Sequence, residues 1–151
     1  MRITNASGDE LLLVIVRYQF PDVHEDRWDS NWLIVNGTVA AAGEKWVFTE
    51  PCVTTFELAD LADWLDEVAA NGSEPAAFEF TEPHLKFTYV PRPRPAVQVT
   101  LAHESAPASL SDVERRHGVT VEFPLSVQET ATFADEIRQA LREYPIRGGA
   151  A

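Results

Sequence analysis

Two stretches of the chain carry apolar residues at the spacing of an amphipathic helix. They are residues 55–70 and 127–144, in which apolar side chains recur every three or four positions. At the start of each, a hydroxyl residue precedes a glutamate by three positions, the spacing of a capping box. The pattern predicts two helices, with the buried stripes Leu58, Leu61, Ala62, Leu65, Val68 and Ala69 in the first and Phe133, Ala134, Ile137, Leu141 and Tyr144 in the second.

Apolar and polar residues alternate in four other segments, which is typical of antiparallel strands with one buried face. These segments lie near residues 78–80, 85–89, 97–101 and 119–123. Residues 11–16, Leu-Leu-Leu-Val-Ile-Val, are apolar without alternation. We therefore expect residues 11–16 to form a central strand that is covered on both faces.

Two further strands are expected at residues 32–39 and 45–48. Asn36-Gly37 is a common hairpin dipeptide, but a turn there would leave very short strands on either side. We therefore favour one long strand that turns at Ala42-Gly43-Glu44.

The remaining segments are expected to be connections. Residues 91–95, Pro-Arg-Pro-Arg-Pro, form a sheet edge or a connection, because proline has no amide proton to donate to a neighbouring strand. Residues 104–117 are expected to form an exposed loop with one helical turn near residues 110–116.

The order strands, helix, strands, helix defines an α+β domain with a mainly antiparallel sheet. The 151 residues are enough for one domain with a substantial core. We expect a single domain over residues 1–145, followed by a flexible tail at 146–151.

Acidic residues dominate the first 90 positions. The chain has 24 Asp and Glu against 12 Lys and Arg, a net charge of −12, and residues 1–90 alone hold 16 acids and 5 bases, a net charge of −11. Binding to nucleic acid or to an anionic membrane needs clustered Lys and Arg, so neither is expected as a direct partner. The N-terminal residues contain no apolar signal core, and we expect a cytoplasmic protein.

The sequence contains no recognisable catalytic motif. Its histidines do not have zinc-protease spacing, and it lacks both a glycine-rich phosphate loop and the G-x-S-x-G pattern. The single cysteine, Cys52, excludes an internal disulfide and is expected to be a buried thiol. We therefore expect no enzymatic activity, no cofactor and no bound metal.

Four carboxylates lie close together in one polar segment, at Asp22, Glu25, Asp26 and Asp29. Oxygen ligands at this density would suit calcium, although the spacing is not that of an EF-hand loop. The same residues suit a solvated acidic loop, or a contact surface for a basic partner. The sequence leaves the three interpretations open, with calcium binding the least favoured of them.

A second acidic surface is expected on the first helix, opposite its apolar stripe, formed by Asp60, Asp63, Asp66 and Glu67. Trp64 lies between the two faces, where it either covers the edge of the core or anchors an interface. Trp28 and Trp32 have the same two interpretations, with a core position favoured for Trp32. The candidate partner-binding residues are therefore the four loop carboxylates, the four helix carboxylates and Trp64.

Three stretches together resemble the WapI-type bacterial immunity proteins. The first is Tyr18-Gln19-Phe20-Pro21, which leads into Asp-Ser-Asn-Trp-Leu at residues 29–33. The second is Glu50-Pro51-Cys52-Val53, which runs into the helix with Leu61 and Trp64-Leu65. The third is Phe-Thr-Glu-Pro-His-Leu-Lys-Phe at residues 80–87. The resemblance covers most of residues 8–90.

The resemblance implies a cytoplasmic antitoxin that silences the C-terminal domain of a secreted toxin, often a nuclease, and that needs no cofactor. A nuclease is commonly basic where it meets phosphate, so an acidic inhibitor suits a basic toxin domain encoded next to it. Two alternatives stay open. One is an acidic interaction or structural domain without a toxin partner, and the other is a carboxylate-based enzyme, which would need two carboxylates with shifted pKa values in a pocket.

Overall fold

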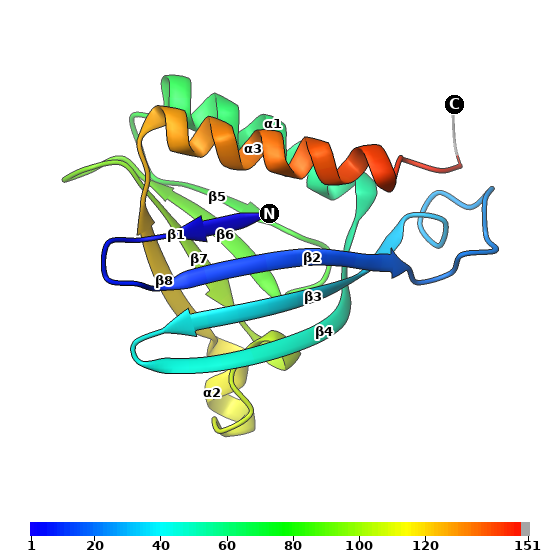
Figure 1. Ribbon diagram of the computed structural model, residues 1–151, viewed down its shortest axis with the longest axis horizontal. Helices are drawn as coiled ribbons and strands as arrows, with labels where there is room; N and C mark the ends of the chain where they lie inside the picture. The colour runs from blue at the N-terminus through cyan, green and yellow to red at the C-terminus, as the bar shows by residue number, and fades with distance from the viewer. Residues whose placement is uncertain (149–151) are drawn as a thin grey trace.

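Two four-stranded antiparallel sheets and two long helices share one hydrophobic core in the computed structural model, which describes residues 1–148 (Figure 1). The expected α+β fold with antiparallel strands is confirmed. In both sheets each strand pairs with its neighbour in the chain. Sheet A contains β1 (Arg2–Thr4), β2 (Glu10–Tyr18), β3 (Trp32–Ala41) and β4 (Glu44–Thr54). Sheet B contains β5 (Ala76–Glu79), β6 (Leu85–Val90), β7 (Ala96–Leu101) and β8 (Val119–Pro124).

Helices α1 (Thr55–Asn71) and α3 (Val127–Glu143) lie side by side along one edge of the sheets (Figure 1). Both predicted capping boxes are present, and the predicted bounds differ from the observed ones by one residue. The helices bury Leu61 and Ile137 at the centres of their apolar stripes. The Phe133 ring of α3 stacks on Phe87 of β6 at 6.2 Å between ring centroids, which joins the helices to sheet B.

The long strand β3 and its turn at Ala42-Gly43 confirm the favoured connection over a hairpin at Asn36-Gly37. Gly43 has a φ of 82°, a left-handed conformation that favours glycine. Gly37 instead lies inside β3, opposite Phe48 of β4. A Cβ atom at residue 37 would collide with the Phe48 ring, so a close approach between strands explains this glycine.

The expectation that residues 11–16 are covered on both faces is wrong. In β2 the side chains of Leu11, Leu13 and Ile15 enter the core, whereas Val14 and Val16 are 46% and 48% exposed. Helices and sheet B cover only the inner face of sheet A, so its outer face meets solvent. The apolar run therefore does not indicate two covered faces.

Residues 103–117 are less exposed than the sequence suggested. They contain a short 3₁₀ helix, η1 (His103–Ser105), and α2 (Asp112–His117), which includes most of the expected helical turn. Ser105 is completely buried, and its backbone carbonyl accepts a hydrogen bond from the Trp46 indole at 2.8 Å. This bond ties the segment to β4 and removes part of it from solvent.

Cys52 lies in β4 and is completely buried, as expected for a structural thiol. Burial raises the pKa of this thiol to about 12. Residues 91–95 connect β6 to β7, in agreement with the proline pattern.

The segment after α3 packs on the loop between β2 and β3. Arg147 places its guanidinium 3.4 Å from the centroid of the Tyr18 ring and donates a hydrogen bond to the Pro21 carbonyl at 3.0 Å. Residues 149–151 of the expected tail lie outside the described residues.

Candidate partner-binding surface

The loop between β2 and β3, residues 19–31, has a defined internal structure and is called the acidic loop below. The Asp26 carboxylate accepts hydrogen bonds from the backbone amides of Trp28 at 2.8 Å and of Asp29 at 2.7 Å. These two bonds turn the chain at this point. Asn31 is completely buried at the base of the loop. Its side chain donates to the carbonyl of Arg27 at 2.7 Å and accepts a hydrogen bond from the Thr55 hydroxyl at the start of α1. The acidic loop is therefore held to the helix layer from within.

The structure places all four predicted loop carboxylates on the surface. Asp22, Glu25, Asp26 and Asp29 are exposed, and none of them forms an ion pair with another described residue. Over residues 1–148 no group of three or more acidic, histidine or cysteine side chains is arranged to hold a metal ion. The structure therefore gives the calcium interpretation of this loop no support.

Trp28 stands among these carboxylates and is 45% exposed. Its ring meets the Phe56 ring edge-on at 5.0 Å and lies 6.4 Å from the Trp32 ring. The Arg27 guanidinium lies 5.3 Å from the centroid of Phe56. Trp32 is half-buried, so of these two tryptophans Trp28 presents the larger exposed area beside the acidic groups.

The predicted acidic face of α1 is partly engaged within the molecule. The Arg138 guanidinium on α3 lies 2.8 Å from a carboxylate oxygen of Asp63 and 2.7 Å from one of Asp66. Hydrogen bonds to Asp63 and then Asp66 raise the pKa of Arg138 above its ordinary value. Asp60 and Glu67 are exposed and form no ion pair among the described residues, so they are the more accessible half of this face.

Trp64 is half-buried, and its ring lies 5.8 Å from the Phe78 ring of β5. Phe78 in turn meets Phe80 edge-on at 5.2 Å. These contacts support the interpretation that Trp64 covers the edge of the core.

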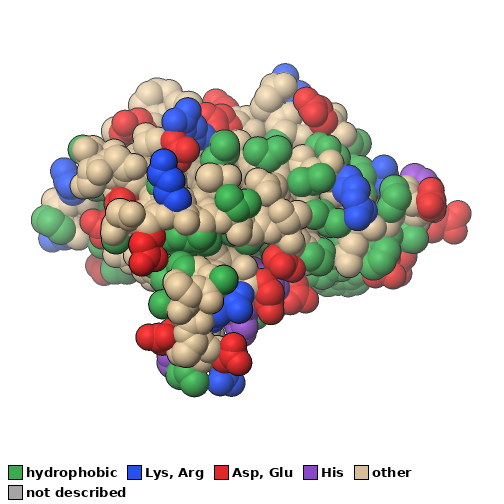
Figure 2. Space-filling model, turned by 60° about the horizontal axis from the view of Figure 1, so that its bottom comes forward, with side chains coloured by type: hydrophobic (Ala, Val, Ile, Leu, Met, Phe, Trp, Pro, Cys, Tyr) green, Lys and Arg blue, Asp and Glu red, His purple; other side chains and the backbone are tan. Residues whose placement is uncertain are grey.

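The sequence reasoning missed an exposed apolar surface on the outer face of sheet A. Val14, Val16 and Val47 are each at least 46% exposed. Leu12 of β2 pairs with Thr38 of β3, which in turn pairs with Val47 of β4. Figure 2 shows hydrophobic side chains among uncharged ones across the middle of this side. The corresponding face of sheet B carries polar side chains: Lys86, Thr88, Gln98, Thr100, Thr120 and Glu122. The absence of alternation in residues 11–16 was the signal for this surface, because both faces of β2 are apolar.

The carboxylates whose pKa is displaced do not form a catalytic pair. A hydrogen bond from Lys86 lowers the pKa of Glu79, and hydrogen bonds from Ser111 and Ser126 lower those of Glu114 and Glu129. The last two are the capping-box glutamates of α2 and α3. The pKa of Glu104 is also lowered, by a hydrogen bond from its own backbone amide, and its carboxylate lies 2.9 Å from the His84 imidazole. These four shifts follow from local hydrogen bonds, exposed ion pairs and helix capping, and no two of these glutamates are paired with each other, so they give a carboxylate-based enzyme no support.

Comparison with known families identifies the class of this protein. The profile of the immunity protein WapI-like family matches residues 2–145, so the chain belongs to that family and is an immunity protein by class. The family implies a cognate toxin that is neutralised by binding, and such proteins are typically not enzymes. No curated protein and no solved structure matches the chain. Over residues 1–148, no helix is long and apolar enough to cross a membrane.

Proposed function

We propose that this chain neutralises the C-terminal toxin domain of a secreted bacterial toxin by binding it in the cytoplasm of the producing cell. The observation that carries the proposal is the family match over residues 2–145. Neutralisation then needs only a stable complex that covers the working surface of the toxin.

The charge distribution supports a toxin domain with a basic surface, as in a nuclease that holds phosphate. The net charge is −12, and the four carboxylates of the acidic loop have no cationic partner among the described residues. Opposite charges on two proteins speed their encounter, most strongly at low salt. Fast capture suits an antitoxin, because free toxin damages the cell that makes it.

The acidic loop is proposed as the first docking element. Its backbone is fixed by Asp26 and Asn31, so little conformational freedom remains to be lost when a partner binds. Trp28 gives the loop an exposed aromatic side chain of the kind that often dominates interface energies. The α1 face, with Asp60 and Glu67 available and Asp63 and Asp66 paired to Arg138, is proposed as an adjoining part of the same surface.

Co-expression tests this function. A toxin domain encoded beside this chain's gene is expressed in a bacterial host with and without the chain. We expect the toxin domain alone to stop growth, and co-expression to restore growth and yield a complex that co-purifies. If every adjacent toxin domain stays toxic and fails to co-purify with the folded chain, the immunity function is wrong and the chain is better described as an acidic interaction domain.

A further inference from the structure

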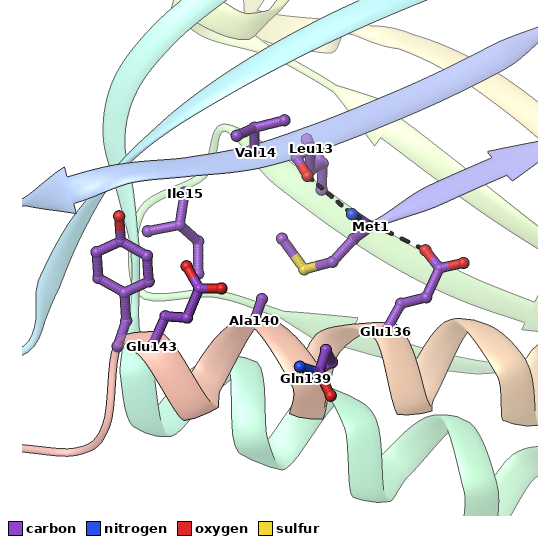
Figure 3. Close-up of a pocket in the computed structure, with 9 residues that line it drawn as sticks. Met1, Leu13, Val14, Ile15, Glu136, Gln139, Ala140 and Glu143 are labelled. Carbon is purple, nitrogen blue, oxygen red and sulfur yellow. Dashed lines mark hydrogen bonds and ion pairs between the residues drawn. The ribbon is translucent and has the colours of Figure 1, made fainter.

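A groove of about 380 Å³ runs between β2 and α3 (Figure 3). Ile15 from β2 and Ala140 from α3 point toward each other across it, and Met1 lies at one end. Glu136 and Glu143 stand on the α3 side, and Tyr144 also lines the groove. Its walls therefore combine an apolar floor with two carboxylates.

One wall of the groove is a strand edge that β1 does not cover. β1 accompanies β2 as far as Leu13, where the Met1 amino group donates to the Leu13 carbonyl at 3.0 Å and the Leu13 amide donates to the Met1 carbonyl at 2.9 Å. Backbone groups on one edge of an antiparallel strand recur at every second residue. The next pair on this edge is therefore the amide and carbonyl of Ile15, which face the groove. Such an edge can accept an added strand.

The charges around the groove select a cationic occupant. No Lys or Arg among the described residues lines it. Glu136 accepts a hydrogen bond from the Arg2 backbone amide at 2.7 Å and lies 3.9 Å from the Met1 amino group, yet its side chain remains 41% exposed. A guest that brings Lys or Arg to Glu136 and Glu143 would therefore complement the rim.

The groove is continuous with the acidic loop. Tyr144, which lines the groove and donates to the Val16 carbonyl at 3.1 Å, meets the Tyr18 ring at 5.6 Å between centroids. The Arg147 guanidinium also lies over the Tyr18 ring, and it donates a hydrogen bond to the Pro21 carbonyl of the loop. A single partner can thus cover both features.

We propose that this groove receives an extended segment of the toxin, which adds as a short strand to the edge of β2 at Ile15. An apolar side chain of that segment packs between Ile15 and Ala140, and flanking Lys or Arg side chains face Glu136 and Glu143. The inference rests on the proposed function and names the part of the toxin chain that is recognised.

The test measures binding of the adjacent toxin domain to variants of the full chain. Ala140→Trp fills the groove, and Gln128→Trp places the same side chain on an exposed position of α3 outside it. We expect Ala140→Trp to weaken binding about tenfold or more, as blocking a central contact does, and Gln128→Trp to bind like the wild type. Ala140 is half-buried, so a tryptophan there could also disturb the packing of α3. The double variant Gln139→Lys plus Glu143→Lys changes two exposed residues of the groove and provides a second test that does not depend on the packing of a new ring.

Hydrogen exchange supplies a readout specific for strand addition. The Ile15 amide should exchange more slowly in the complex with wild-type chain, because it then donates to the toxin backbone. Unchanged Ile15 exchange, or wild-type binding by both groove variants, would show that the toxin docks without this groove.

Two further outcomes separate the possible failures. If the wild-type chain does not bind the toxin domain at all, the proposed function fails before the groove is tested. If the chain alone sediments as a dimer that Ala140→Trp converts to a monomer, the groove holds a second copy of the chain, and the toxin assignment is overturned.

Discussion

Asn31 holds the backbone of Arg147, 116 residues away, with both ends of its side-chain amide. The amide nitrogen donates to the Arg147 carbonyl at 2.7 Å, and the amide oxygen accepts the Arg147 backbone N–H at 2.9 Å. The same side chain bonds the Arg27 carbonyl and the Thr55 hydroxyl. One buried amide therefore joins the acidic loop, the start of α1 and the segment after α3.

Asn31→Ala should destabilise the protein by about 3 kcal/mol, because it leaves several buried polar groups without partners. Denaturant unfolding measures this change in the free energy of unfolding. Asn36→Ala is the matched control, since Asn36 is half-buried on the outer face of sheet A and donates one hydrogen bond, to Thr49. Equal losses in the free energy of unfolding for Asn31→Ala and Asn36→Ala would mean that Asn31 does not fix the loop.

Leu61→Ala and Ile137→Ala should each cost about 2–5 kcal/mol, as large-to-small changes in a packed core do. Both side chains are at most 1% exposed in the helix layer. Val47→Ala, at a position that is 63% exposed, should change stability by about 0.5 kcal/mol or less. Thermal melts compare the three variants, and unchanged melting of both helix variants would contradict the packing described.

The part of the fold that local pattern determines was predictable from the sequence. Capping boxes and apolar spacing gave both long helices, and Gly43 marked the β3–β4 turn. The absence of alternation in residues 11–16 marks both faces of β2 as apolar, but it does not show that one of these faces is left uncovered, because an apolar run does not reveal how many faces are covered. The engagement of Asp63 and Asp66 by Arg138 was also hidden, since helix geometry places the acids on a face but does not reveal a cation some 70 residues later in the chain.

The buried thiol of Cys52 should make stability fall at high pH. Its pKa is raised from the ordinary value of 9.0 to about 12 on folding, so the folded state keeps a proton that the unfolded state loses. The contribution of the protonated thiol to the free energy of unfolding is complete below about pH 9. It is lost as the pH rises to about 12, with a slope of about 1.4 kcal/mol per pH unit in that window. Denaturant unfolding between pH 8 and pH 12 should show a shallower decline for Cys52→Ala than for the wild type. Identical slopes would argue against a buried, neutral thiol.

Trp28→Ala should accelerate dissociation of the toxin complex and cost about 2 kcal/mol or more in binding, as loss of an interface tryptophan does. The fold should lose less stability than on truncation of a core residue, because 45% of the Trp28 surface is exposed. Trp64→Ala should show the opposite pattern, with reduced thermal stability and little change in dissociation, because Trp64 packs on Phe78. Dissociation rates and melting curves for both variants distinguish the two roles. If only Trp64→Ala speeds dissociation, Trp64 is the interface residue and Trp28 is not.

The helix face can be tested without disturbing Arg138. Asp60→Lys plus Glu67→Lys changes the two helix carboxylates that form no ion pair among the described residues. If this face adjoins the docking surface, the variant should associate with the toxin more slowly at low salt, with a smaller effect at high salt. Association that matches the wild type at low salt would remove α1 from the proposed surface.

The most direct test of the central claim is the association rate of the toxin domain with loop variants, measured by stopped flow at several salt concentrations. Asp22→Lys plus Glu25→Lys changes two exposed loop carboxylates and spares Asp26, which the loop needs for its turn. Glu44→Lys plus Glu74→Lys makes the same change in net charge at exposed positions outside the loop. We predict that the loop pair slows association about tenfold at low salt and flattens its salt dependence, while the control pair has a much smaller effect. Association of the loop pair at the wild-type rate would contradict capture of the toxin through the acidic loop.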